Sequence, residues 1–241
     1  MEVYLLEQTE ADVPLENDWL SPGELARLDS LPFPKRRVDW RLGRWTAKRA
    51  LAAPRDLRPQ PHVLARIEIR PLPSGAPQAY FDNMPGEITI SLSHRSGIAM
   101  CAVADSSVDL GCDLEVIEAR SDAFLTDYFT QDEQAVVAQA SAADRFRLLA
   151  LLWSAKESAL KAMHEGLRLD TRCVAVNHVG RSSDFHGWSR LHVLYAGQKV
   201  FHGWCRQAGA MVQTLIADPA PNSPILLRRS AYASDHVPTC A

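Results

Sequence analysis

The feature that most constrains the fold of this chain is an internal repeat. The run Trp45-Thr46-Ala47-Lys48 returns 108 residues later as Trp153-Ser154-Ala155-Lys156. Each copy lies in a long helical pattern with few β-branched interruptions, which we expect to span residues 35–53 and 143–163. Self-similarity at a fixed offset indicates duplicated structural units. The sequence therefore predicts two similar units, each built around one long helix.

Strand patterns follow each predicted helix. In the first half, residues 87–92 and 97–104 flank the stretch Ser93-His94-Arg95-Ser96, which predicts a hairpin that turns there. In the second half, residues 199–206 and 210–217 form a similar pair that turns near Gly209. The repeated order predicts an α+β fold, a pseudo-two-fold pair of similar subdomains, each a long helix packed on a small, mainly antiparallel sheet.

We expect the boundary between the halves near Ser106-Ser107. This gives an N-terminal half of residues 1–107, a C-terminal half of residues 108–218 and a Pro-rich tail of residues 219–241 that is extended or partly disordered. Two such halves leave a cleft between them, and clefts of this kind are common ligand sites. We therefore expect the distinctive residues of the two halves to face one another across it.

Composition limits the class of partner. With 241 residues, 46% of them hydrophobic, the chain can bury one sizeable core or two of about a hundred residues each. A net charge of −3 argues against a nucleic-acid-binding surface, so an anionic ligand has to meet a local basic patch. The start Met1-Glu2 lacks the positive charge of a signal peptide and no apolar run reaches transmembrane length, so we expect a cytoplasmic protein. The five cysteines lack CxxC spacing, which predicts neither a disulfide framework nor a zinc site.

Three carboxylates stand at spacings that suit a magnesium-bound diphosphate. Asp113 and Glu115, in the run Gly111-Cys112-Asp113-Leu114-Glu115, are two residues apart in a predicted strand and so project to one face. Glu157 lies in the second long helix, four residues before Lys161. Mg²⁺ prefers such oxygen ligands together with substrate phosphates.

Each of these motifs also has an ordinary structural explanation. Glu followed four residues later by Lys is a common helix-stabilising pair, and an Asp-x-Glu pair at a strand end is often a solvated edge. The combination of the two motifs in one chain favours a site over surface pairs.

Cations gather in the first long helix. Arg37, Arg41 and Arg44 follow one another at i, i+4 and i+7, so they share one helix face. Such a stripe is suited to a phosphate but is also typical of a solvated surface. Ser93 and His94, in the predicted turn, add a hydroxyl and a ring N–H that can bind phosphate oxygens.

The two motifs resemble the signatures of the 4′-phosphopantetheinyl transferase superfamily, in its larger two-halved type, which activates siderophore, surfactin and related carrier-protein synthetases. Those signatures are Gly-hydrophobic-Asp-hydrophobic-Glu and Trp/Phe-Ser/Thr/Cys-x-Lys-Glu-Ser/Ala-x-x-Lys, which residues 111–115 and 153–161 match. Supporting matches lie at residues 41–44, 90–94 and 129–133. The resemblance covers roughly residues 21–217.

The resemblance implies an enzyme that transfers the phosphopantetheine arm of coenzyme A, its co-substrate, to a serine of an apo acyl or peptidyl carrier protein. Adenosine 3′,5′-bisphosphate is released, and the two-halved form implies a monomer. The implied catalytic residues are Glu157, Lys161 and Asp113, with Glu157 also a candidate general base, and the implied ligands of the Mg²⁺ cofactor are Asp113, Glu115 and Glu157. The implied coenzyme A contacts are Arg37, Arg44, Ser93, His94, Lys156 and Lys161.

The chain departs from the pattern of the family at three places, of which one, Cys112 in place of a usual aliphatic residue, is compatible with burial. The family's usual Gly-Lys-Pro reads Gly75-Ala76-Pro77 here, so one expected cation near the coenzyme is missing. Its usual Gly-x-Gly-Leu after the second signature reads His164-Glu165-Gly166-Leu167, which puts the local turn geometry in question.

Other functions stay open at this point. They are a non-catalytic coenzyme A sensor or scaffold, a metal-dependent phosphohydrolase, and a purely structural α+β protein. For the transferase, we expect the carrier to meet an apolar groove beside Phe124, Leu125, Tyr128 and Phe129. Fatty acid, polyketide and non-ribosomal peptide synthesis all fit as the pathway served.

Overall fold

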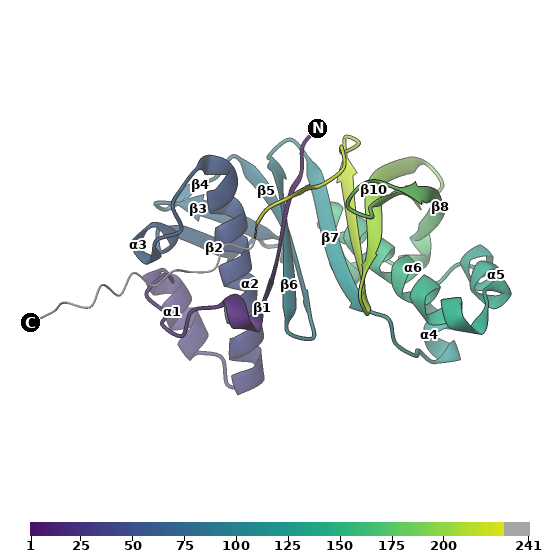
Figure 1. The fold of residues 1–241 in the computed structure, drawn as a ribbon, viewed down its shortest axis with the longest axis horizontal. Coiled ribbons are helices and arrows are strands. Elements are labelled where there is room, and N and C mark those ends of the chain that lie inside the picture. The colour runs from purple at the N-terminus through teal and green to yellow at the C-terminus, as the bar shows by residue number, and fades with distance from the viewer. Residues whose placement is uncertain (229–241) are drawn as a thin grey trace, which may run out of the picture.

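A computed structural model describes residues 1–228, and these form layers in the order helix, sheet, sheet, helix (Figure 1). Helix α2 (Pro34–Ala52) covers the outer face of the first sheet, and α6 (Ala142–Ala162) covers the outer face of the second. The two sheets pack against one another in the middle of the molecule. The prediction of a mixed α+β fold with one long helix on each sheet is confirmed.

The first half holds a main sheet and a smaller one. The main sheet has the strand order β12-β1-β6-β5, and the smaller one has the order β2-β3-β4. The strands of the main sheet are β1 (Tyr4–Thr9), β5 (Ile88–Arg95), β6 (Ile98–Asp105) and β12 (Ile225–Leu226). The remaining elements are α1 (Pro22–Asp29), α3 (Pro61–Leu64), β2 (Ile67–Pro71), β3 (Pro77–Phe81), β4 (Met84–Pro85) and 3₁₀ turns at Glu10–Asp12 and Ala53–Arg55.

The second half holds one antiparallel sheet of strand order β7-β11-β10-β9-β8. Its strands are β7 (Asp109–Val116), β8 (Val174–Ser183), β9 (Ser189–Tyr195), β10 (Lys199–Ala208) and β11 (Met211–Asp218). The helices beside α6 are α4 (Asp122–Tyr128) and α5 (Gln131–Gln139), with 3₁₀ turns at Gly166–Arg168 and Thr171–Cys173.

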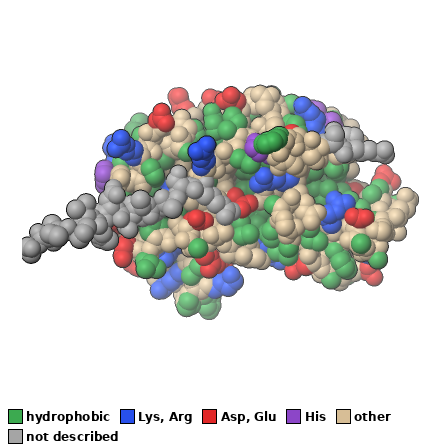
Figure 2. Space-filling model, viewed as in Figure 1, with side chains coloured by type: hydrophobic (Ala, Val, Ile, Leu, Met, Phe, Trp, Pro, Cys, Tyr) green, Lys and Arg blue, Asp and Glu red, His purple; other side chains and the backbone are tan. Residues whose placement is uncertain are grey.

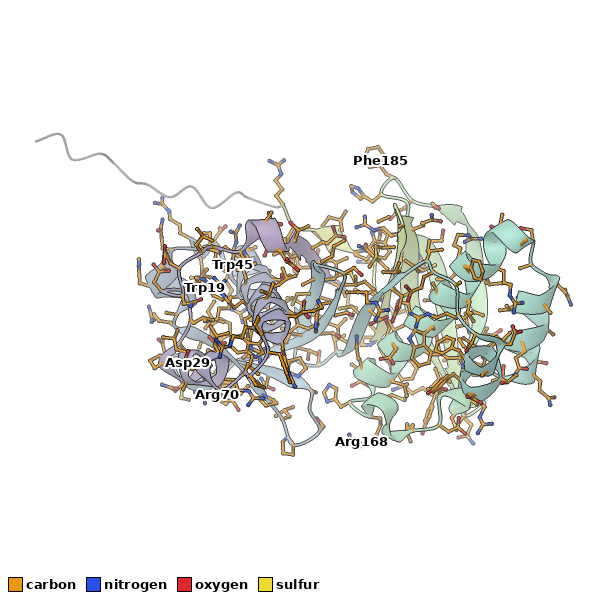
Figure 3. All side chains as sticks on the ribbon, turned by 90° about the horizontal axis from the view of Figure 1, so that it is seen from below. Trp19, Asp29, Trp45, Arg70, Arg168 and Phe185 are labelled. Carbon is orange, nitrogen blue, oxygen red and sulfur yellow. The ribbon has the colours of Figure 1, made fainter. Side chains whose placement is uncertain are left out.

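Strand alternation divides the core. Leu6 on β1 and Cys101 on β6 face α2, whereas their neighbours Leu5 and Ala102 face the second sheet, as the two-residue period of a strand requires. Trp19 and Trp45 pack edge to face in the first core, with ring centroids 5.1 Å apart (Figure 3). Burial on both faces explains why β6 reads as an almost continuous apolar run.

The hairpin of the first half turns later than the sequence predicts. Arg95 pairs with Ile98, so the turn consists of Ser96 and Gly97, whose φ angles are 51° and 75°. Two positive φ angles in a two-residue loop match the right-handed twist of the flanking strands. Ser93 and His94 therefore lie within β5, not in a turn.

The chain returns to the first half after β11. Ile225 and Leu226 pair in parallel with Tyr4 and Leu5 on β1, so this part of the predicted tail completes the first sheet. The rest of that tail, residues 229–241, lies outside the described residues.

Two further features of the structure are the distribution of charge on its surface and the apolar character of its helices. On the face drawn in Figure 2, basic and acidic side chains are interspersed, in keeping with the small net charge. Within residues 1–228, none of the helices combines the length and the apolar character needed to cross a bilayer.

Candidate active site

Helix α6 lies directly on β7 because residue 111 is glycine. A Cβ placed on Gly111 would lie 1.7 Å from the backbone oxygen of Ser158, a distance at which no side chain fits. The close approach brings Asp113, two residues further along β7, against Lys161 of α6. The glycine of the first motif thus sets the distance between the two motifs.

Asp113 is the centre of a polar network that joins both halves. Its side chain is 5% exposed. Its Oδ1 accepts hydrogen bonds from Ser93 Oγ at 2.8 Å and from Lys161 Nζ at 2.7 Å. Lys161 Nζ also donates to the carbonyl oxygen of Cys112 at 3.1 Å. Because Ser93 comes from the first sheet and Lys161 from α6, the two halves hold one carboxylate between them.

The other oxygen of Asp113, Oδ2, is buried without a hydrogen-bond partner. A buried carboxylate oxygen left unpaired is costly, and a cation would satisfy it. Burial lowers the pKa of Lys161, but Asp113, Cys112 and Glu157 act together in the opposite direction, so that the pKa is raised overall. Lys161 is therefore held in its charged form beside a carboxylate that still has one free oxygen.

The charge of Asp113 acts on two further carboxyl groups, those of Glu157 and Glu115. The pKa of Glu157 is raised, first by burial and then by the charges of Asp113 and Glu115, while Lys161 opposes the shift. Burial and Asp113 likewise raise the pKa of Glu115, although Arg120, whose guanidinium donates to it at 3.1 Å, acts in the opposite direction. These shifts mark a region where added positive charge, as a proton or a cation, is favourable.

The carboxylates fit a divalent cation in part. The unpartnered Oδ2 of Asp113 and the all-oxygen donor set suit Mg²⁺. However, residues 1–228 contain no group of three or more His, Cys, Asp or Glu side chains arranged to hold a metal ion. The set Asp113, Glu115 and Glu157 is therefore not assembled in advance, and oxygens of a ligand would have to complete the coordination.

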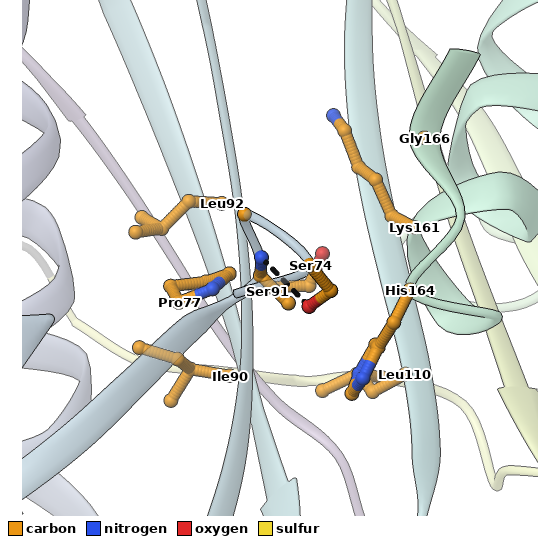
Figure 4. Close-up of a pocket in the computed structure, with 11 residues that line it drawn as sticks. Ser74, Pro77, Ile90, Ser91, Leu92, Leu110, Lys161, His164 and Gly166 are labelled. Atoms are coloured by element: carbon orange, nitrogen blue, oxygen red, sulfur yellow. Dashed lines mark hydrogen bonds between the residues drawn. The ribbon is translucent and has the colours of Figure 1, made fainter. Parts of the chain in front are cut away.

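A cleft leads away from this network. One part of it, with a volume of about 250 Å³, extends from Lys161 to His164 over the floor formed by Ser91 (Figure 4). A second part of about 290 Å³ reaches Trp40 and Arg44. The two parts share the lining residues Gly75, Pro77 and Leu92. Side chains of both halves line the first part, as the sequence predicts.

Of Arg37, Arg41 and Arg44 on α2, the structure brings only Arg44 into the cleft. Its guanidinium lies 4.8 Å from the ring centre of Trp40, and its Nε lies 3.7 Å from Glu24. Burial lowers the pKa of Arg44, and Glu24 opposes this. Arg37 instead donates to the carbonyl oxygen of Leu31, and Arg41 to the carbonyl oxygen of Pro14, so these two tie loops to the helix.

His94 lines the same part of the cleft as Arg44. The surrounding protein lowers its pKa by limiting hydration, Asp39 opposes the shift, and Lys161 supports it. A neutral imidazole offers one N–H to a phosphate oxygen.

The structure does not bring Lys156 into the cleft. The side chain is fully buried, and its Nζ lies 2.9 Å from Glu133 of α5 and 2.9 Å from the carbonyl oxygen of Thr171. These groups take up the ammonium, so Lys156 is not presented to a ligand here and we leave it out of the coenzyme site proposed below.

The aromatic residues expected beside the carrier groove pack on one another and on Trp153. Phe129 is 1% exposed and packs in a core with Leu125. Phe124 and Tyr128 stack edge to face on Trp153, with centroids 5.0 and 5.2 Å away. Leu125 and Phe129 are therefore core residues, and Tyr128 is the exposed member of this set.

Sequence reasoning missed His164 as a lining residue. Its φ of 57° lies in the left-handed region that favours glycine. The resembled pattern has glycine at this position, so the departure noted in the sequence was the available signal. The turn after α6 keeps the conformation of a glycine turn and places an imidazole at the cleft.

Comparisons with known proteins match the chain to a family model and to solved structures. Residues 109–206 match the family model described as the 4′-phosphopantetheinyl transferase superfamily. Among solved structures, the chain is similar to the holo-[acyl-carrier-protein] synthase of Helicobacter pylori in complex with coenzyme A, at 16% identity and a TM-score of 0.33 over 43% of this chain and 99% of that one. No curated protein sequence matches the chain.

Proposed function

We propose that the chain, whose residues 109–206 match the model of the 4′-phosphopantetheinyl transferase superfamily, moves the phosphopantetheine arm of coenzyme A to a serine of an apo acyl or peptidyl carrier protein. The observation that carries this proposal is the network of Asp113 and Lys161, with its unpartnered carboxylate oxygen, beside a cleft lined by both halves. Adenosine 3′,5′-bisphosphate is the second product.

In the proposed reaction the serine oxygen attacks the phosphorus that bears the pantetheine arm. The bond from that phosphorus to the bridging diphosphate oxygen breaks, and the serine proton leaves to a base. Catalysis of such a step depends on positioning and on cations near the phosphoryl oxygens. Mg²⁺, when bound by Asp113 with Glu115 and Glu157, would neutralise charge on the diphosphate.

The side chains of the protein supply the other functions that the reaction requires. Lys161 orients Asp113 and directs positive charge toward the diphosphate. Glu157 accepts the serine proton, directly or through a water, because its raised pKa makes it a stronger base than an exposed carboxylate. The hydroxyl proton of Ser93 is taken up by Asp113, so Ser93 holds that carboxylate in place and is not assigned to the coenzyme. His94 supplies a ring N–H from β5, and Arg44 binds the 3′-phosphate at the far part of the cleft.

We assign the coenzyme contacts mainly to residues 1–107 and the metal site and catalytic helix to residues 108–218. Residues from both halves line the cleft within one chain, so we expect the enzyme to act as a monomer. We also expect it to act in the cytoplasm.

The test is the intact mass of an apo carrier domain after incubation with the protein, coenzyme A and Mg²⁺. We expect a gain of one phosphopantetheine unit that disappears without the metal and in Glu157→Gln. Arg37→Ala, altered outside the cleft, is the matched control and should retain the gain. Coenzyme A binding with no gain on acyl or peptidyl carriers would instead favour a non-catalytic sensor.

A further inference from the structure

Each half contains a buried ion pair between a glutamate and the lysine of the repeat. In the first half, Glu24 Oε2 lies 2.5 Å from Lys48 Nζ, and in the second, Glu133 Oε2 lies 2.9 Å from Lys156 Nζ. Both lysine side chains are 0% exposed. We call these the N-terminal ion pair and the C-terminal ion pair.

The duplication includes the way each glutamate caps a helix. Glu24 accepts the backbone N–H of Ser21 and donates its own N–H to Ser21 Oγ at the start of α1. Glu133 makes the same two bonds with Thr130 at the start of α5. Both are capping boxes, in which side chain and backbone satisfy each other's free groups.

The duplication also includes a strand. The other oxygen of Glu24 accepts the backbone N–H of Ile69 on β2 at 3.2 Å, and that of Glu133 accepts the N–H of Val176 on β8 at 2.9 Å. Each ion pair therefore joins a short helix, a long helix and a strand at one buried point.

What lies beside the two ion pairs differs. Arg44 stands one turn before Lys48, and its Nε is 3.7 Å from Glu24 of the N-terminal ion pair. Glu157 follows Lys156 directly on α6 and stands one turn before Lys161, which donates to Asp113 Oδ1 at 2.7 Å. One ion pair thus adjoins the cleft arginine, and the other adjoins the carboxylate of the catalytic helix.

We propose that the C-terminal ion pair positions Glu157 for the phosphoryl-transfer step and that the N-terminal ion pair positions Arg44 for coenzyme A binding. This inference rests on the proposed function. Successive residues on a helix point about 100° apart, so fixing Lys156 fixes the rotation of α6 and the direction of Glu157. Small displacements of a reacting group slow a reaction strongly, whereas a displaced binding residue weakens affinity.

A contribution to the free energy of unfolding does not by itself explain why both ion pairs are present. Replacing a buried ion pair by apolar side chains of similar volume is often neutral or stabilising. Helix α6 is also held to β11 on another side, through hydrogen bonds of Ser154 and Ser158 to Thr214. The ion pair adds a second, separate constraint on the rotation of the helix.

The experiment compares two matched double variants, Glu133→Gln with Lys156→Met and Glu24→Gln with Lys48→Met. Each removes both charges and keeps an oxygen that can cap the helix. Coenzyme A affinity is measured by calorimetry, and kcat and KM are measured on an apo carrier domain. We expect the first variant to lose about tenfold or more in kcat with an unchanged coenzyme A Kd, and the second to raise that Kd about fivefold or more with little change in kcat.

Equal losses of kcat and of affinity in both variants would overturn the proposal, because they would indicate a general structural role. If a double variant does not fold, Glu133→Asp and Glu24→Asp, which keep the charges but shorten the side chain, make the same comparison. If the wild type binds coenzyme A but transfers nothing, the proposed function fails. The affinity changes would then still test the role of the N-terminal ion pair.

Discussion

Ser93 Oγ donates a 2.8 Å hydrogen bond to Asp113 Oδ1, and the two residues belong to different sheets. Ser93 lies on β5 and Asp113 on β7, each at one end of the strand order of its sheet. Two residues earlier, Ser91 Oγ accepts the backbone N–H of Cys112 at 2.9 Å. The position of the central carboxylate therefore depends on the N-terminal half.

Ser93→Ala removes this bond and leaves Oδ1 of Asp113 with Lys161 alone. Loss of one buried hydrogen bond to a charged group should reduce kcat/KM about tenfold, or about 1.4 kcal/mol. Steady-state transfer to an apo carrier measures it, with Ser106→Ala on the exposed turn as the control. Equal kcat/KM for the two variants would mean that the bond does not hold Asp113 in place.

The raised pKa values of Glu115 and Glu157 predict how metal binding depends on pH. A carboxyl whose pKa is raised by folding stabilises the native state below its ordinary pKa of about 4.3, and this contribution is lost as pH rises through the elevated value. A divalent cation replaces the missing proton. Mg²⁺ should therefore raise the Tm more at pH 8 than at pH 5, as thermal unfolding with and without the metal can measure. In Asp113→Ala, the increase in Tm caused by Mg²⁺ should differ less between pH 8 and pH 5. If Mg²⁺ left the wild-type Tm unchanged at both pH values, the metal site would be contradicted.

Gly111→Ala should force α6 away from β7. The new Cβ would meet the backbone oxygen of Ser158 at 1.7 Å, and backbone cannot move aside cheaply. We expect a loss of about 3 kcal/mol or more in the free energy of unfolding, measured by denaturant titration. Gly43→Ala, in α2 with nothing within 4 Å, is the matched control and should gain up to about 1 kcal/mol. Similar values for the two variants would be inconsistent with direct helix–strand contact.

Arg44→Ala tests the assignment of the 3′-phosphate. A charge-assisted hydrogen bond contributes about 1.5–3 kcal/mol, so KM for coenzyme A should rise about tenfold or more. KM for 3′-dephospho-coenzyme A should be the same in wild type and variant. Arg37→Ala, which loses only a loop contact, should change neither value. If Arg44→Ala affected both donors equally, the arginine would bind another part of the coenzyme.

The long helices could be predicted from the sequence to within one residue at each end, because they combine helix formers with an uninterrupted pattern. The hairpin turn was placed wrongly because the Ser-His-Arg-Ser run is polar, whereas the backbone turns where Gly97 allows a positive φ. Polar residues near a strand end do not distinguish a strand from a turn. Here Ser93 is buried against Asp113, whereas His94 lines the cleft.

The motif that contains Lys156 could not predict that its side chain points into the core and away from the cleft. Its partner Glu133 lies 23 residues earlier, on another helix. The repeat nevertheless contained a signal. Lys48 occupies the equivalent position in a half that has no Asp-x-Glu motif. A lysine present in both copies is more simply explained by a contact common to both halves than by a ligand bound at one of them.

The pairing of Ile225 and Leu226 with β1 has a consequence for the order of folding. Strand β1 is synthesised before the other strands of its sheet, and its parallel neighbour β12 follows it by some 220 residues. Contacts this distant in sequence form slowly, because the loop between them must close first. A fragment that stops at Ser107 would leave that edge of β1 unpaired. The N-terminal half can therefore reach its final stability only after the C-terminal half has been made, and the two halves should unfold together.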